Sequence, residues 1–225
     1  MAESLAHRWG QITGDCFETF VRGILASVAS ECGLYLDFKR PRKARGGRGK
    51  VTWQDGYGNT HDLDYVLERG GTEEVRGIPT AFIESAWRRY TKHSKNKVQE
   101  TEAAVMPVAL TFSRHQPFLG AVLAGEFTRN ALQQLESKGF AVLHVPYQSI
   151  LTAFRALGID ASSEDGVEGT TEAEFRTKIA KWQSLPQPRA TERLVAKLHT
   201  RHRREYGISS SGLKPRSRGG TTLPL

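Results

Sequence analysis

The chain opens with a helical pattern of apolar residues. Between residues 10 and 32 they recur at spacings of three and four, with Phe17, Phe20 and Ile24 among them, which predicts an amphipathic helix. Gly33 is suited to end that helix in a left-handed conformation. The period then changes to two, which is typical of strands. The strand-like segments are 34–38, 51–53, 61–67 and 78–87, with a hairpin turn at 55–59.

Helical and extended patterns alternate over the next part of the chain. Ser94 is suited to begin a helix. The elements expected after it are a helix over about 95–105, a strand over 118–124, a helix over 130–138, a strand over 140–145 and a helix over 148–157. This order predicts an α/β fold in which a mixed central sheet is flanked by helices. We expect residues 1–160 to form that domain.

The last third of the chain has a different composition. Residues 161–169 are rich in Ser, Asp, Glu and Gly, which is typical of a linker, and helical patterns return at 172–182 and 191–206. We therefore expect a helical C-terminal extension over 161–208. Residues 209–225 are rich in Ser, Gly, Pro and Arg and are predicted to be a disordered basic tail.

Composition excludes several classes of protein. A chain of 225 residues suits one domain with appendages and buries enough surface to fold without disulfide or metal staples. Two cysteines, Cys16 and Cys32, are too few for a disulfide framework or a four-cysteine zinc site. No segment approaches the roughly 20 apolar residues of a membrane span, and the N-terminus does not resemble a signal peptide. We expect a cytoplasmic protein without a membrane partner.

The basic residues are concentrated in three segments. The net charge is +8, yet residues 39–50 alone carry +7, residues 85–98 carry +5 and residues 189–225 carry +7. The rest of the chain is therefore acidic. A single basic run is usually a solvated loop. Three such runs, one of them adjoining a group of carboxylates, favour contact with nucleic-acid phosphates.

Three acidic residues lie on two strand-like segments. Asp62 and Asp64 alternate on the first, and Glu84 follows an apolar approach on the second. If the two strands are adjacent, Asp64 and Glu84 meet at one end of the sheet. Paired carboxylates in basic surroundings suit a hard cation such as Mg²⁺, which activates water and neutralises phosphate charge. The alternative is a buried salt bridge from one of these acids to Arg88 or Arg89.

These residues resemble the PD-(D/E)XK family, the restriction-endonuclease-like phosphodiesterases. The resemblance rests on Asp64, about twenty residues of hairpin, Glu84, and then a Lys-rich helix, and it extends over about residues 10–158. It implies a restriction-endonuclease-like core in which Asp64 and Glu84 hold Mg²⁺ or Mn²⁺, with Asp62 as the competing aspartate. It also implies that Glu18, on the first helix, is an auxiliary acid.

One position departs from the family pattern. The family has a lysine two residues after the glutamate, and this chain has Ala86. Some members take the amine from the following helix, and Lys95 and Lys97 are placed for that role. Arg88 and Lys92 are weaker candidates for the same role, and Gln99 resembles a polar residue that several members use near the site.

The resemblance implies a Mg²⁺-dependent endonuclease that cleaves DNA, in restriction-modification or antiviral defence, acting as a homodimer. The nucleic-acid contacts expected from the basic segments are Lys39, Arg40, Arg42, Lys43, Arg45, Arg48, Lys50, Arg88, Arg89 and Lys92. We interpret residues 39–50 as a flexible basic arm, since Val51 after Lys50 excludes a phosphate-binding P-loop.

Two alternatives remain open. The first, favoured by Ala86, is a nuclease-like fold without catalysis that serves as a DNA-binding or assembly module. The second is an RNA-binding protein that depends on the basic arm alone.

Overall fold

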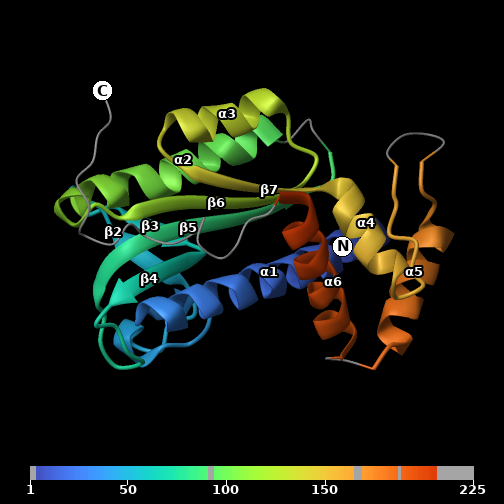
Figure 1. The fold of residues 1–225 in the computed structure, drawn as a ribbon, viewed down its shortest axis with the longest axis horizontal. Coiled ribbons are helices and arrows are strands. Elements are labelled where there is room, and N and C mark those ends of the chain that lie inside the picture. Colours follow the sequence, from blue (N-terminus) through green and yellow to red (C-terminus); the bar gives the residue numbers. More distant parts are fainter. Residues whose placement is uncertain (1–3, 91–93, 165–168, 187–188, 207–225) are drawn as a thin grey trace.

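The computed structural model describes residues 4–90, 94–164, 169–186 and 189–206. The chain begins with one long helix and five strands, and then alternates helices and strands before two final helices (Figure 1). The elements are α1 (Leu5–Cys32), β1 (Tyr35–Phe38), β2 (Val51–Gln54), β3 (Thr60–Leu63), β4 (Tyr65–Arg69), β5 (Ile78–Arg88), α2 (Ser94–Thr111), β6 (Phe118–Gly125), α3 (Arg129–Ser137), β7 (Ala141–Pro146), α4 (Tyr147–Arg155), α5 (Glu172–Ser184) and α6 (Arg189–Tyr206).

The main sheet has five strands in the order β1-β4-β5-β6-β7. Strands β1, β4 and β5 are antiparallel neighbours, whereas β5, β6 and β7 are parallel. The parallel pairs need helical crossovers, and α2 and α3 supply them. The prediction of a mixed α/β sheet flanked by helices is therefore confirmed.

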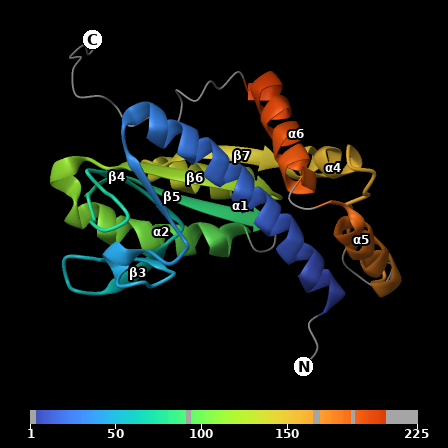
Figure 2. The same cartoon turned by 90° about the horizontal axis from the view of Figure 1, so that it is seen from below.

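Helices cover both faces of the sheet. Helix α1 crosses one face diagonally, with α4, α5 and α6 at one end of it (Figures 1 and 2). Its buried side chains, including Phe17 and Phe20, share a core cluster with Ile83 on β5. On the opposite face α2 and α3 enclose a second core around Phe82 and Val105. Strand β5 is thus buried on both sides, as its continuous apolar run requires.

Helix α1 has defined ends. Ser4 precedes it, and its hydroxyl accepts a hydrogen bond from the backbone N–H of His7. Gly33 ends it in the left-handed conformation, with φ of 63°. The chain then turns directly into β1. The predicted helix and its terminating glycine are confirmed.

The strand expected over residues 61–67 is in fact two strands. Residues up to Leu63 pair with β2 in a separate two-stranded sheet, and residues from Tyr65 pair with β1 and β5 in the main sheet. Asp64 is the residue between them, at the point where the chain passes from one sheet to the other. The single alternating strand predicted here was wrong, and the interruption determines where the Asp64 side chain lies.

The two C-terminal helices pack on the body of the protein. Trp182 of α5 and Leu194 and Leu198 of α6 belong to the same core cluster as the buried residues of α1. Burial of these side chains therefore fixes the extension against α1 and α4. The tail predicted as disordered, 209–225, lies outside the described residues.

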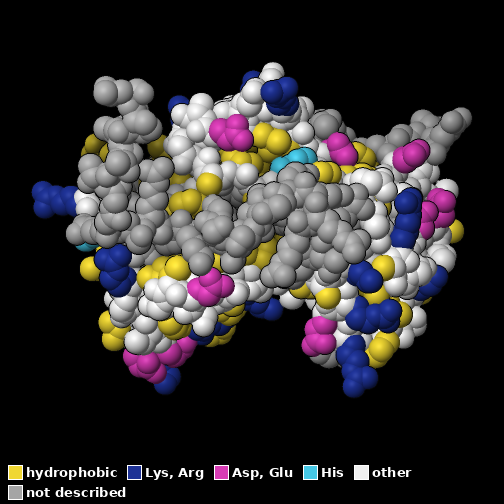
Figure 3. All heavy atoms as spheres, viewed as in Figure 1, with side chains coloured by type: hydrophobic (Ala, Val, Ile, Leu, Met, Phe, Trp, Pro, Cys, Tyr) yellow, Lys and Arg dark blue, Asp and Glu magenta, His cyan; other side chains and the backbone are white. Residues whose placement is uncertain are grey.

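Charged side chains are unevenly distributed over the described surface. On the face shown in Figure 3, several Lys and Arg side chains gather over α5 and α6, while Asp and Glu side chains are prominent at the opposite lower corner. No helix among the described residues is both long and apolar enough to cross a bilayer.

Candidate active site

Asp64 and Glu84 meet at the end of β4. The antiparallel register pairs Tyr65 with Ile83, which places Asp64 beside Glu84. Glu84 Oε1 accepts a hydrogen bond of 3.0 Å from the backbone N–H of Asp64. Asp64 Oδ2 in turn accepts from the Ser85 backbone N–H at 2.8 Å and from Ser85 Oγ at 3.3 Å. These reciprocal bonds fix both carboxyl groups, and the expectation that the two acids converge is confirmed.

The electrostatic environment of this pair is unfavourable for two negative charges. Glu84 is only 5% exposed, on the strand face that also carries the buried Phe82 and Ala86. Burial raises the pKa of Glu84, and the nearby Asp64 carboxylate raises it further. A buried carboxylate beside another is costly unless a cation or a proton joins them. The pair is therefore a place where positive charge binds favourably.

Two cavities meet at these acids, between α1 and the sheet. The larger, about 570 Å³, reaches from Glu18 and Asp64 past Ser85 to the end of β5 and to α2. The smaller, about 250 Å³, lies on the other side and shares those same three residues. Glu84 lines neither cavity and lies behind Asp64. Solvent and ligands thus reach the acid pair along the Asp64 side.

Glu18 lies at the junction of the two cavities, as the resemblance implied for an auxiliary acid. It is on α1, and its backbone carbonyl accepts a hydrogen bond of 3.1 Å from the hydroxyl of Tyr65 on β4. Partial burial raises the pKa of Glu18, Asp64 and Asp15 raise it further, and Lys39 and Arg22 lower it. The side chain therefore experiences the charge of Asp64 directly.

Lys97 is the lysine of α2 that lies near the acids. Ala86 is buried at 6% exposure in the core under α2, and no charged group extends from that position. Lys97, on the first turn of α2, lines the larger cavity and is a charge that lowers the pKa of Glu84. Lys95 is exposed and lines neither cavity. Of the two lysines expected from the sequence, the structure brings only Lys97 to the acids.

Asp62 is not part of the site, so its prediction as a metal ligand was wrong. It lies on β3 directly opposite Thr52 of β2, in the separate two-stranded sheet. Its carboxylate accepts from Lys50 Nζ at 2.6 Å and from Thr52 Oγ1 at 2.7 Å. The change of sheet at Asp64 breaks the alternation that was expected to put Asp62 on the same face.

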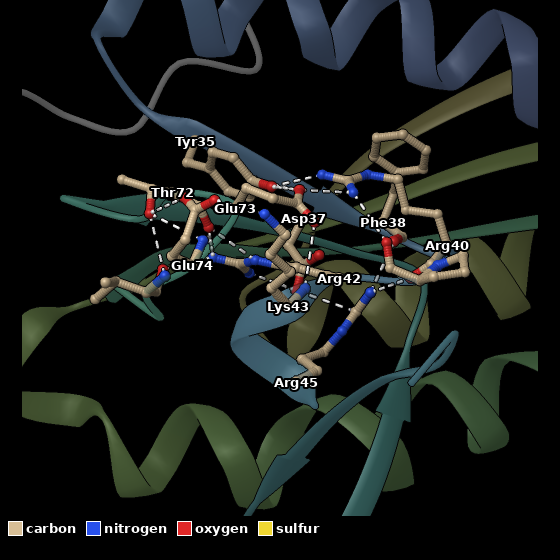
Figure 4. A network of polar contacts seen from close by, with 12 residues as sticks. Tyr35, Asp37, Phe38, Arg40, Arg42, Lys43, Arg45, Thr72, Glu73 and Glu74 are labelled. Atoms are coloured by element: carbon tan, nitrogen blue, oxygen red, sulfur yellow. Dashed lines mark hydrogen bonds and ion pairs between the residues drawn. The ribbon is translucent and has the colours of Figure 1, made fainter. Parts of the chain in front are cut away.

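The segment predicted as a flexible basic arm is largely anchored in the protein. Arg42 is fully buried and forms ion pairs of 2.6 Å with Glu68 and 2.8 Å with Asp37 (Figure 4). Arg45, 6% exposed, pairs with Asp37 at 3.2 Å and bonds the Arg40 carbonyl. Arg42 and Arg45 are therefore structural cations, and their assignment as nucleic-acid contacts was wrong.

The other basic residues predicted to bind nucleic acid fall into three groups. Arg40 pairs with Glu73 at 2.8 Å, and Lys50 pairs with Asp62. Lys43 and Arg48 are exposed and line neither cavity. The residues that do line a cavity are Lys39, Arg88 and Arg89. Lys92 lies outside the described residues.

The basic residues of the larger cavity are held by contacts of their own. Arg88 donates a hydrogen bond to the Trp87 carbonyl. The Glu100 carboxylate lies 3.9 Å from the Arg88 guanidinium and 3.8 Å from the Lys97 ammonium group. Arg89 donates a hydrogen bond of 3.0 Å to Ser163. These side chains form a basic wall beside the acids rather than salt bridges to them, in contrast to the alternative interpretation.

Two residues of the site were not predicted from the sequence. Ser85 anchors Asp64 through its backbone and its hydroxyl. Arg22 lines the smaller cavity. Its spacing of four residues from Glu18 on α1 could have indicated it, because residues four apart share a helix face.

The donor set fits a hard divalent cation. Within the described ranges, no group of three or more His, Cys, Asp or Glu side chains is arranged to hold a metal. Mg²⁺, however, is commonly held by only one or two carboxylates together with water and substrate phosphates. Asp64 and Glu84 provide two carboxylates fixed by backbone bonds and flanked by Lys97.

No family model and no curated protein sequence matches the chain. A crystal structure described as that of a protein of unknown function, AF1548, has 14% sequence identity to it. The match covers 81% of this chain and 97% of that chain, with a TM-score of 0.36.

Proposed function

We propose that the protein is a divalent-metal-dependent endonuclease that hydrolyses DNA phosphodiester bonds. The observation that carries the proposal is the acid pair itself. Asp64 and Glu84 are fixed together, burial and the Asp64 carboxylate raise the pKa of Glu84, and neither acid has an arginine partner within the described residues. They open through Asp64 onto a cavity whose wall carries Lys97, Arg88 and Arg89.

Each residue has a definite task in this proposal. Asp64 and Glu84 would hold Mg²⁺ or Mn²⁺, which lowers the pKa of a bound water and neutralises phosphate charge. Ser85 keeps Asp64 oriented through its two hydrogen bonds. Lys97 orients the attacking water and stabilises charge on a phosphate oxygen beside Glu84. Arg88 and Arg89 contact neighbouring phosphates, and Glu18 assists as a second acid at the cavity junction.

The biological role we propose is the one that the resemblance implies, restriction-modification or antiviral defence, with a homodimer cutting both strands. An inactive nuclease-like module for DNA binding or assembly is the second candidate. The specific observation in its favour is Ala86, which is buried and leaves no cation at the position two residues after Glu84.

Plasmid cleavage distinguishes the two candidates. Supercoiled DNA is incubated with the protein and Mg²⁺ or Mn²⁺, with EDTA as the metal-free reference. We expect nicking or linearisation by the parent chain and by Asp62→Asn, and loss of at least about 100-fold in Asp64→Asn and Glu84→Gln. Asp62→Asn is the matched control, because Asp62 is only two residues from Asp64 but lies in the separate two-stranded sheet and pairs with Lys50. Binding without cleavage in either metal would instead support the inactive module.

A further inference from the structure

We propose that Arg22 and Lys39 form a second phosphate subsite, on the opposite side of the acids from Lys97. A single nucleic-acid strand would then pass from the larger cavity, across Asp64, into the smaller one. This inference rests on the proposed function, because it assigns the path of the substrate through the same site. Neither residue belongs to the expected metal-binding set.

The arrangement of the cavities supports a continuous path. Glu18, Asp64 and Ser85 line both cavities, so the two spaces meet at the acid pair. Lys97, Arg88 and Arg89 line one side of this junction, and Arg22 and Lys39 line the other. A phosphodiester backbone carries a negative charge at each nucleotide, and cations on both sides of a reaction site suit successive phosphates.

Both side chains are available for an incoming anion. Within the described ranges, neither Arg22 nor Lys39 lies within ion-pair distance of a carboxylate, whereas Arg40, Arg42, Lys43 and Lys50 all do. The smaller cavity is also lined by Asp15 and Glu18, whose charges a bound divalent cation would offset. Arg22 and Lys39, the two cations that line the smaller cavity, therefore have no ion pair among the described residues that a phosphate would have to displace.

The protein holds the Arg22 side chain and the backbone of Lys39 in place before any ligand binds. The Arg22 guanidinium lies 5.3 Å from the centroid of the Phe38 ring, a stacked position that limits its rotamers. Lys39 follows Phe38 directly, and the loop after it is fixed by the buried Arg42 and Arg45. An arginine held in this way can contact a phosphate with both fork nitrogens at little cost in entropy.

Salt-dependent binding tests the inference without relying on catalysis. A fluorescein-labelled single-stranded oligonucleotide is titrated by anisotropy at several salt concentrations, with Ca²⁺ as the divalent cation. The variants are Arg22→Ala and Lys39→Ala, singly and together. Lys43→Ala is the matched control, since Lys43 is an exposed lysine of the same loop that pairs with Glu74 outside both cavities.

We expect each of the two variants to weaken binding several-fold and to reduce the slope of log Kd against log salt by about 0.7, the value for one phosphate contact on a single strand. Circular dichroism verifies that the variants are folded.

An affinity and a salt slope equal to those of Lys43→Ala would overturn the subsite. If Asp64→Asn abolishes cleavage but the slope is unchanged, the nuclease stands and this inference fails. If no variant or parent cleaves while the slope falls, the proposed catalysis fails and the subsite stands.

Discussion

Two pairs of acids in the same part of the molecule have different electrostatic arrangements. Asp37 and Glu68 are enclosed by the guanidinium groups of Arg42 and Arg45, within 2.6–3.2 Å. Asp64 and Glu84 accept hydrogen bonds from backbone N–H groups instead, and Asp64 lines a cavity. Both groups lie in the part of the sheet formed by β1, β4 and β5.

The difference is the one we expect between acids with a structural role and acids with the function proposed here. Arginine partners pair with both acids of the first group, although burial raises the pKa of Asp37 and its Oδ1 has no hydrogen-bond partner among the described residues. These ion pairs hold one conformation of the loop between β1 and β2. The second group has an excess of negative charge that only an added cation or proton relieves. We infer that the fold pairs acids with arginine where it needs rigidity, and leaves Asp64 and Glu84 without an arginine partner at the place where we propose that metal binds. Four predictions sharpen or break this comparison.

Removing the buried arginine has the largest expected effect on stability. Arg42→Met leaves Glu68 and Asp37 without their shared cation, so we expect a loss of about 3–5 kcal/mol in the free energy of unfolding. Lys43→Met, at an exposed ion pair on the same loop, should change it by no more than about 0.5 kcal/mol. Urea denaturation followed by circular dichroism measures both. If Arg42→Met and Lys43→Met both change the free energy of unfolding by the same small amount, the two acid groups do not differ as proposed.

Lys97 and Lys95 provide a matched pair on α2. Lys97→Ala removes the cation beside Glu84, and we expect cleavage to fall by about 100-fold, within the range for a positioned proton-transfer or charge-stabilising group. Lys95→Ala, at an exposed position outside the cavities, should leave the rate within about twofold. Single-turnover plasmid cleavage measures both rates. The assignment of the replacement lysine is wrong if Lys95→Ala is the slower variant.

The metal-free protein should gain stability when an acid of the second group is neutralised. Glu84→Gln keeps an oxygen to accept the Asp64 N–H. Burial and Asp64 raise the pKa of Glu84 to about 8, so at pH 7 the metal-free chain must bind a proton on folding, a cost that glutamine avoids. We therefore expect a gain of about 0.5–2 kcal/mol in EDTA at pH 7. Adding Mn²⁺ should stabilise the parent chain and not this variant. Thermal denaturation with and without metal tests both statements, and a loss of stability in EDTA would contradict the comparison.

The smallest expected effect is a change in the reactivity of the Cys16 thiol, which depends on how closely α1 packs on the sheet. Cys16 is buried at 3% exposure, and burial raises its pKa to about 12, so at pH 8 it stays a protonated, unreactive thiol. Cys32 is exposed and should react with an aromatic disulfide reagent at once. We expect one fast thiol in the parent chain and in Glu84→Gln, and faster reaction of Cys16 in Arg42→Met. Two fast thiols in the parent would show that α1 is not closed over the sheet.

Much of the fold follows from local patterns. The order of helices and strands was predictable because periodicity and terminating glycines act over short distances. The convergence of Asp64 and Glu84 followed from the adjacency of two strands. Helix α2 was predicted to end near residue 105, yet it continues through Pro107 to Thr111, because Val108 and Ala109 pack into the core beneath it.

What could not be predicted depends on contacts between distant segments. The basic run 39–50 has the composition of a solvated arm. Glu68, a carboxylate that pairs with the buried Arg42, is 26 residues away in the sequence. The pattern of polar and apolar residues around Asp64 does not indicate that the chain changes sheet there. The choice between Lys95 and Lys97 depends on the rotational position of α2 against the sheet, which tertiary packing decides.

The most direct test of the central claim is a titration of the metal-free chain with Mn²⁺, followed by electron paramagnetic resonance of the free ion. The uncompensated acids at 64 and 84 predict one bound Mn²⁺ per chain, retained in Asp62→Asn and lost in Asp64→Asn and Glu84→Gln. Binding that is absent from the parent chain, or that is the same in all four proteins, would contradict the account.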